Sequence, residues 1–97
     1  MRFEWDEEKN RANIQKHGLN FADAWEIFER PMLTAPDIRE DDGEDRWIGV
    51  GFLRERVAVV VFAERSDDTL RIISLRKALK HERTRFEETL RDGLDAS

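Results

Sequence analysis

The apolar run Val57-Ala58-Val59-Val60-Val61-Phe62-Ala63 decides how this chain of 97 residues folds. The run falls far short of the roughly 20 residues that a membrane-spanning helix needs. Because it is apolar at every position, both of its faces must be buried, which is typical of a strand at the centre of a sheet. The run therefore predicts a sheet that extends on both sides of it.

Further strand patterns surround this central run. Residues 46–53 alternate apolar and polar positions, and residues 70–76 predict the next strand. Only short polar turns separate these two segments from the run, which favours antiparallel neighbours. Residues 2–5 alternate in the same way. Residues 33–38 predict a strand at a sheet edge, because Pro36 cannot donate a backbone hydrogen bond.

Helix signals lie at the two ends of the chain. Asp6 can cap a helix that Gly18 ends, and Asn20 can begin a second helix that Pro31 stops. A third helix is expected from Leu79 onwards. The order β-α-α-β-β-β-β-α predicts an α+β fold, with two N-terminal helices and one C-terminal helix packed on a mostly antiparallel sheet of four to five strands.

Composition excludes several classes of protein. The chain has no cysteine, which rules out disulfides, thiol nucleophiles and zinc–cysteine sites. Acidic residues follow Met1 where a signal peptide would need a basic and then an apolar stretch. We therefore expect a soluble, cytoplasmic, single domain of residues 1–97, with no membrane partner.

Charge is unevenly distributed along a chain whose net charge is −5. Residues 71–85 carry one acidic side chain, Glu82, among many basic ones. The basic residues are Arg71, Arg76, Lys77, Lys80, Arg83 and Arg85. Such a stretch is compatible with a polyanion site, with an interface to an acidic partner, or with a solvated and salt-bridged face.

Known catalytic motifs are missing. There is no glycine-rich phosphate loop, because Gly49 and Gly51 lie inside a strand pattern, and no nucleophile elbow. The two histidines, His17 and His81, have no partners at metal-binding spacing, so we expect neither a metal nor a cofactor. The acidic residues 40–45 are expected to form a solubilising loop.

Polar residues at strand ends remain as candidates for chemistry. Glu64 and Arg65 directly follow the central run, and a short turn should bring them near Arg71. Strict alternation places Ser74 and Arg76 on the same face as the apolar Leu70 and Ile72, and Arg71 and Lys77 on the other face. Arg76 and Lys77 lead toward Lys80 and Arg83 in the terminal helix.

These groups could cleave RNA without a metal ion, which needs a base, charge stabilisation on the phosphate and an acid for the leaving 5′-oxygen. Arginines can bind the phosphate, and Glu64 or a histidine can supply the base. Plainer roles stay open: Glu64 and Arg71 could form a surface salt bridge, and His17 could cap a helix. Trp5, Trp25 and Trp47 could stack on bases, although core packing is the simpler role for them.

Blocks spread over residues 2–88 resemble the BrnT family. In the first half they are Phe3-Glu4-Trp5-Asp6, Asn13, Lys16-His17-Gly18, Phe21, Ala24 and Phe28. In the second half they are Glu64-Arg65, Arg71-Ile72-Ile73-Ser74, Arg76-Lys77-Ala78 and Glu82-Arg83. One departure is Phe86, where relatives often carry tyrosine; this chain has no tyrosine at all.

The resemblance implies a RelE-like fold and a ribonuclease toxin of a type II toxin–antitoxin system that arrests translation. It also implies a ribbon-helix-helix (BrnA-like) antitoxin, and operator DNA that is bound only through the toxin–antitoxin complex. Separately, a chain this small with apolar strands could form a homodimer within that complex by pairing through a sheet edge. The alternative is a non-catalytic module that binds the antitoxin and acts as a transcriptional co-repressor.

Residue by residue, the resemblance and the basic stretch predict a site. We expect Arg65, Arg71, Arg76 and Lys77 to bind and neutralise the phosphate. The proton is expected to be moved by His17 or Glu64. RNA-binding contacts are expected from Arg71, Ser74, Lys80 and Arg83.

Overall fold

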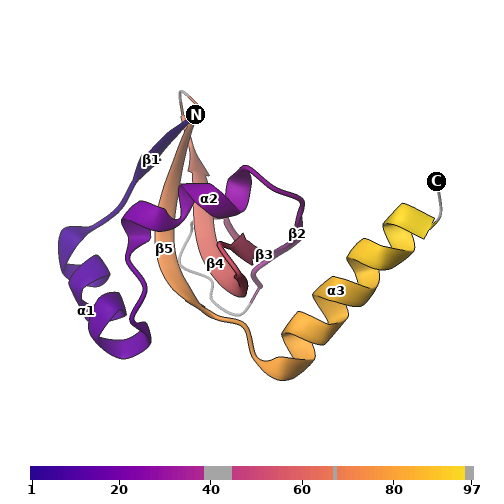
Figure 1. The fold of residues 1–97 in the computed structure, drawn as a ribbon. Coiled ribbons are helices and arrows are strands. Elements are labelled where there is room, and N and C mark those ends of the chain that lie inside the picture. Colours follow the sequence, from indigo (N-terminus) through magenta and orange to yellow (C-terminus); the bar gives the residue numbers. More distant parts are fainter. Residues whose placement is uncertain (39–44, 67, 96–97) are drawn as a thin grey trace.

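A five-stranded sheet with helices on two sides forms the fold (Figure 1). The structure, a computed structural model, describes residues 1–38, 45–66 and 68–95. The predicted acidic loop at 40–45 therefore lies, apart from Asp45, outside the described residues. In chain order the elements are β1 (Arg2–Glu4), α1 (Glu7–His17), the 3-10 turn η1 (Phe21–Asp23), α2 (Trp25–Phe28), β2 (Met32–Pro36), β3 (Arg46–Leu53), β4 (Arg56–Arg65), β5 (Thr69–Lys77) and α3 (Lys80–Asp95).

β4 lies at the centre of the sheet, whose strand order is β1-β5-β4-β3-β2. The central position predicted for the apolar run is thus confirmed, and residues 57–63 are all buried. β2 to β5 pair antiparallel, whereas β1 pairs parallel to β5. β2 forms one edge, with Pro36 opposite Trp47, as the proline predicts.

Local signals set both ends of α1. The Asp6 carboxylate accepts hydrogen bonds from the backbone N–H groups of Glu8 and Lys9, at 2.8 and 3.1 Å. These bonds, that from Lys9 foremost, lower the pKa of Asp6 because they stabilise its charged form. Gly18 ends the helix in the left-handed conformation, with φ of 70°.

The prediction of one continuous second helix is wrong. Instead of one helix up to Pro31, the chain makes the short turn η1 and the four-residue helix α2. The buried residues Phe21, Ala24 and Ile27 recur every third position, which is the period of a 3-10 helix rather than an α-helix. Trp25 points outward and is 48% exposed, so its predicted place in the core is also wrong.

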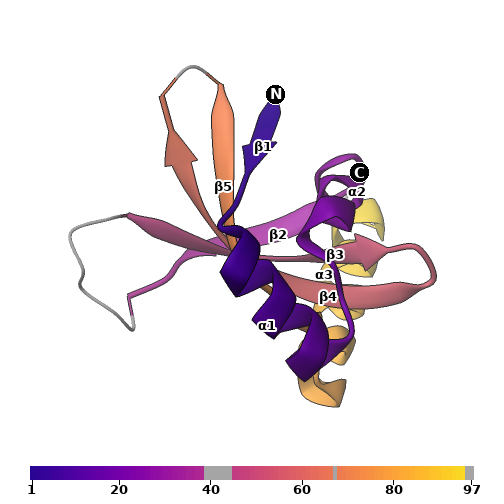
Figure 2. The same cartoon turned by 90° about the vertical axis from the view of Figure 1, so that its left-hand side faces the viewer.

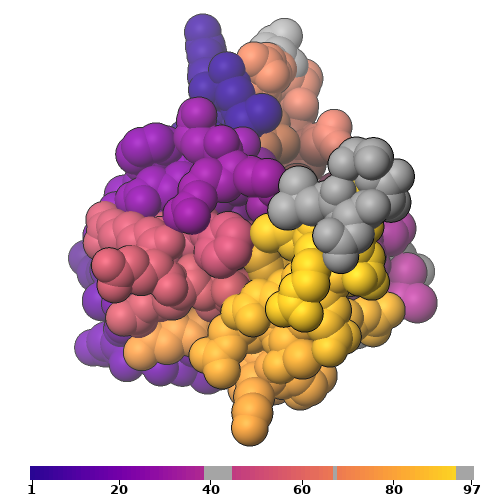
Figure 3. All heavy atoms as spheres, turned by 45° about the vertical axis from the view of Figure 1, so that its right-hand side comes forward, coloured from indigo at the N-terminus to yellow at the C-terminus, as the bar shows by residue number. Residues whose placement is uncertain are grey.

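The sheet separates two packing layers. α1 and α2 lie on one side of it and α3 on the other (Figures 1 and 2). On the α3 side, the Phe86 ring packs edge-on against Phe52 with centroids 5.1 Å apart, which confirms the core role expected for Phe86. The space-filling view shows α3 lying over this side, with its first turn at the lower end of the molecule (Figure 3). No helix among the described residues is long and apolar enough to cross a membrane.

Candidate functional site

A β-bulge rearranges the polar residues of β5. Val61 pairs with Ser74, whereas its neighbour Phe62 pairs with Ile72, so Ile73 is an extra residue on β5. On the two sides of the bulge, therefore, residues of the same parity in the sequence point to opposite faces of the sheet. Residues directly opposite each other in an antiparallel pair share a face, so Arg71, Ser74 and Arg76 lie on one face and Leu70, Ile72, Leu75 and Lys77 on the other. Strict alternation therefore placed Ser74 and Arg76 on the wrong face.

The predicted site residues fall into two groups at opposite ends of β4 and β5. Arg65 pairs with Thr69 at one end of the ladder, and Ala58 pairs with Lys77 at the other. Seven residue steps separate these pairs along β4, or about 23 Å at the usual rise of a strand. Glu64 and Arg65 cannot act on the same phosphate as Arg76 and Lys77 in this arrangement.

The turn between β4 and β5 holds the first group. Ladder pairing brings Glu64, Arg65 and Arg71 to neighbouring positions, as expected, but places Glu64 and Arg71 on opposite faces of the sheet. The salt bridge foreseen between those two side chains is therefore not favoured. Arg65 instead lies 3.9 Å from the carboxylate of Glu4 in β1, and both side chains are about half exposed.

The second group surrounds the end of β5, and α1 reaches it through Asn13. β1 covers β5 only from Thr69 to Arg71, which leaves the later edge of β5 open. The buried side-chain amide of Asn13 fills this gap: its nitrogen donates to the Leu75 carbonyl at 2.8 Å and its oxygen accepts from the Leu75 N–H at 3.2 Å. His17, one helical turn after Asn13, is thereby placed at the end of β5.

Basic residues occur where α1 and β5 end and where β4 and α3 begin, and we call this end of the sheet the basic end. Ala78 donates to the Val57 carbonyl at 3.0 Å, so the start of α3 stays beside the start of β4. Arg56 and Lys77 share one face, because Lys77 is opposite Ala58, two residues beyond Arg56. The basic end consists of Lys16, His17, Arg56, Lys77, Lys80 and Arg83.

Arg76 is bound to Glu82 by a two-point ion pair. Its two terminal nitrogens donate to the two carboxylate oxygens of Glu82 at 2.7 and 2.8 Å. The same carboxylate accepts the backbone N–H of Leu79 at 2.8 Å, which is one half of a capping box at the start of α3. The Arg76 hydrogen bonds hold the pKa of Glu82 at about 2. Arg76 thus fixes α3 relative to β5.

His17 is partly buried and lies near other positive charges. Partial burial of the imidazole, and then the positive charges of Lys16 and Arg76, lower the pKa of His17 below 6.5. A neutral imidazole at neutral pH can accept a proton. Among the residues with described positions, no group of three or more His, Asp or Glu side chains is arranged to hold a metal ion.

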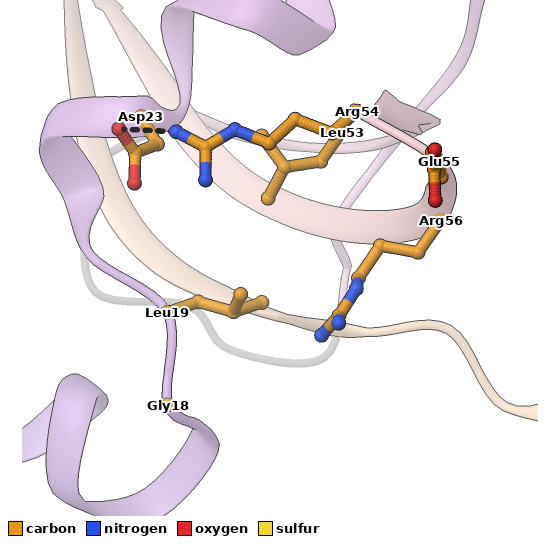
Figure 4. A pocket seen from close by; sticks show the side chains of 7 residues that line it. All are labelled: Gly18, Leu19, Asp23, Leu53, Arg54, Glu55 and Arg56. Atoms are coloured by element: carbon orange, nitrogen blue, oxygen red, sulfur yellow. Dashed lines mark ion pairs between the residues drawn. The ribbon is translucent and has the colours of Figure 1, made fainter.

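A hollow beside the basic end was not foreseen from the sequence. It has a volume of about 460 Å³ and lies between the loop after α1 and the β3–β4 turn (Figure 4). Its lining includes Leu19, Leu53, Arg54 and Arg56. The sequence near 54–56 signals only a tight turn, and no local pattern shows that α1 packs near it.

Comparison with known proteins identifies the family. The model of a family described as "Ribonuclease toxin, BrnT, of type II toxin-antitoxin system" matches residues 5–82. Among solved structures, the chain is similar to the ribonuclease toxin BrnT of Brucella abortus, with 30% sequence identity and a TM-score of 0.62. That match covers 82% of this chain and 99% of the Brucella chain. No curated protein sequence matches the chain. On the family match, which spans most of its length, the chain belongs to the BrnT family of ribonuclease toxins of type II toxin–antitoxin systems.

Proposed function

We propose that this toxin cleaves RNA at its basic end without a metal ion. The observation that carries the proposal is the position of His17, whose pKa is lowered, at the same end of β5 as Lys77 and the start of α3. A base and several cations are the groups that cleavage by the 2′-hydroxyl requires.

In the proposed reaction, the neutral imidazole of His17 takes the proton of the 2′-hydroxyl. The 2′-oxygen attacks phosphorus, and the bond from phosphorus to the 5′-oxygen breaks. The Lys77 ammonium gives a proton to the leaving oxygen, so the products are a 2′,3′-cyclic phosphate and a 5′-hydroxyl end. Lys80 and Arg83 neutralise the charge that develops on the phosphate.

In this proposal Arg76 is a positioning residue. Its terminal nitrogens are both engaged by Glu82, and this bond holds the α3 residues Lys80 and Arg83 near Lys77. The group at the β4–β5 turn, with Glu64, Arg65 and Arg71, is too distant for the reaction. It would contact RNA outside the cleaved bond.

The test uses purified protein and a labelled single-stranded RNA in buffer with excess EDTA. We expect the unmodified chain to release a cyclic phosphate, and the Lys77→Gln/Lys80→Gln variant to lose at least about 100-fold in rate. The Lys9→Gln/Arg91→Gln variant is the control, because it removes the same charge from exposed helical positions elsewhere. Cleavage that stops in EDTA, or that survives in the first variant, would overturn the proposal.

We further propose that a ribbon-helix-helix antitoxin neutralises the toxin by covering the basic end. A type II system supplies a protein antitoxin, and the concentration of cations at the basic end favours an acidic segment of that partner. Co-expression with the short reading frame adjacent to the toxin gene should yield a stable complex. The Lys77→Gln/Lys80→Gln variant should bind that antitoxin at least about tenfold more weakly, and equal affinity would place the antitoxin elsewhere.

A second candidate function is a non-catalytic module that binds the antitoxin and acts as co-repressor. The engagement of Arg76 by Glu82 and the net charge of −5 favour it, since both weaken attraction for RNA. Induction of the chain alone in a bacterium separates the two functions. Growth arrest with loss of total RNA supports the ribonuclease, whereas normal growth with folded protein supports the module.

A further inference from the structure

The β3–β4 turn forms one wall of the hollow between itself and the loop after α1. Arg54, the first residue of that turn, adopts φ of 59°, a conformation that favours glycine. Its guanidinium lies 3.4 Å from Asp23 and 3.3 Å from Glu26, and its carbonyl accepts a hydrogen bond from Arg30 at 2.9 Å. Glycine would adopt this backbone conformation with less strain than arginine. The ion pairs give a reason for arginine, because its side chain connects the turn to η1 (Figure 4) and to α2.

Arg56 lies on the opposite side of the same hollow. Its side chain extends from the start of β4 toward Leu19, whereas Arg54 extends away toward Asp23 (Figure 4). Arg56 is exposed and makes no ion pair with any residue that the structure describes. The hollow that it lines is mixed in character, with the apolar Leu19 and Leu53 and the carboxylates of Asp23 and Glu55.

This combination suits an unstacked nucleobase. Proteins bind single-stranded RNA by stacking its splayed bases on aromatic rings or guanidinium planes and by hydrogen bonds to the base edges. The volume of about 460 Å³ lies in the range of small-molecule sites, roughly 300–1,000 Å³. In this hollow Arg56 would act on the edge of the base and not by stacking, because a guanidinium donates two hydrogen bonds to the acceptors O6 and N7 of guanine and matches the edges of the other bases less well.

The hollow is also close to the proposed reaction. Gly18, on its rim, directly follows His17. On the sheet, Arg56 is two residues from Ala58, the ladder partner of Lys77, so the two backbones are about 8 Å apart. A base held in the hollow would belong to a nucleotide next to the phosphate at Lys77.

We propose that this hollow is a nucleobase subsite that holds a guanine beside the cleaved phosphate, with Arg56 as its specificity-determining residue. The proposal rests on the ribonuclease function proposed above and assigns the substrate base within it.

The test compares three proteins on a pool of random-sequence RNA, with the cleavage sites mapped by sequencing. The unmodified chain should cut next to guanine about tenfold more often than next to other bases. Arg56→Gln, which keeps a polar side chain but removes the planar cation, should lose this preference and lower kcat/KM about tenfold. The control Arg91→Gln removes an exposed arginine of α3 and should match the unmodified chain in both. An unaltered base preference in Arg56→Gln would overturn the subsite even though the ribonuclease function stands.

A binding measurement distinguishes failure of the subsite from failure of the reaction. An oligonucleotide of the same sequence with 2′-deoxyribose cannot be cleaved by this mechanism, so its affinity reports binding alone. If the unmodified chain cleaves no RNA, weaker binding of a guanine-containing oligonucleotide by Arg56→Gln still supports the subsite. Equal binding by the three proteins refutes it.

Discussion

Replacing Glu82 with glutamine tests the ion pair that joins β5 to α3. Glutamine can still accept the N–H of Leu79, so the helix cap is retained while the charge that binds Arg76 is removed. The change thus isolates the Arg76–Glu82 pair, in which the Glu82 side chain is 23% exposed.

The expected magnitude follows from the pKa of Glu82. A carboxyl whose pKa falls from 4.5 to about 2 on folding contributes about 3.4 kcal/mol at neutral pH, before any allowance for solvent. Water reaches this surface pair and screens it, so we expect Glu82→Gln to lower the free energy of unfolding by about 1.5 kcal/mol. For a domain of this size that loss corresponds to roughly 8 °C in Tm.

The pH dependence has a definite sign. Because folding lowers the pKa of Glu82, its stabilisation is complete above pH 4.5 and is lost as the pH falls through about 2. Urea unfolding followed by tryptophan fluorescence at pH 7 and pH 3 measures this. The difference between the unmodified chain and Glu82→Gln should be largest at pH 7 and smaller at pH 3.

The matched control is Glu87→Gln, which removes an exposed carboxylate from the same helix and should change stability by less than about 0.5 kcal/mol. If Glu82→Gln is as stable as the control at pH 7, the ion pair contributes nothing and the reasoning fails. A difference that stays constant down to pH 3 would refute its electrostatic origin.

Three further predictions concern the base, the packing and the docking of α1. The acid limb of the pH profile of kcat/KM should have its midpoint below pH 6.5, because His17 must be neutral to act as the base. Lys16→Gln should raise the pH of that midpoint, because it removes a positive charge near His17. A midpoint that does not move would exclude His17 as the base. Gly51→Ala should lower Tm and cost about 1–3 kcal/mol of stability, since a new Cβ would lie 2.9 Å from Ile27 Cγ2. Asn13→Ala should lower the free energy of unfolding, measured with urea, by about 2–3 kcal/mol, because it leaves the buried backbone groups of Leu75 without their side-chain partner. A loss below about 0.5 kcal/mol would mean that water replaces the amide.

Local patterns predict the strands and α1 because the forces that set them act between near neighbours. The apolar run predicted that β4 lies at the centre of the sheet, and Pro36 predicted an edge strand. Asp6 and Gly18 predicted the two ends of α1. The division of the second helix into η1 and α2 depends on burial against the sheet. The spacing of Phe21, Ala24 and Ile27 could have indicated it, since their period of three is visible in the sequence.

The site was harder to predict because it depends on contacts distant in sequence. The bulge at Ile73 moves Ser74 and Arg76 to the face of Arg71. Its one local signal is the pair of consecutive apolar residues Ile72 and Ile73, which breaks the alternation and which a strict period of two ignores. From the sequence, Glu64 and Arg65 were also expected in one site with Lys77. The structure separates them, because they lie at opposite ends of the paired strands β4 and β5. Arg56 was not singled out from the sequence, because the hollow that it lines is formed by two turns that are distant in the sequence.

The parallel pairing of β1 with β5 has a consequence for synthesis of the toxin on the ribosome. Both β1 and α1 depend on β5: Arg2 lies opposite Thr69, and Asn13 bonds to Leu75, 62 residues later in the chain. A nascent chain therefore cannot close its sheet, or place His17 near Lys77, until most of its length has been translated. Contacts of such long range also form slowly. The arrangement of His17 and Lys77 on which the proposed reaction depends therefore forms only after β5 has been synthesised.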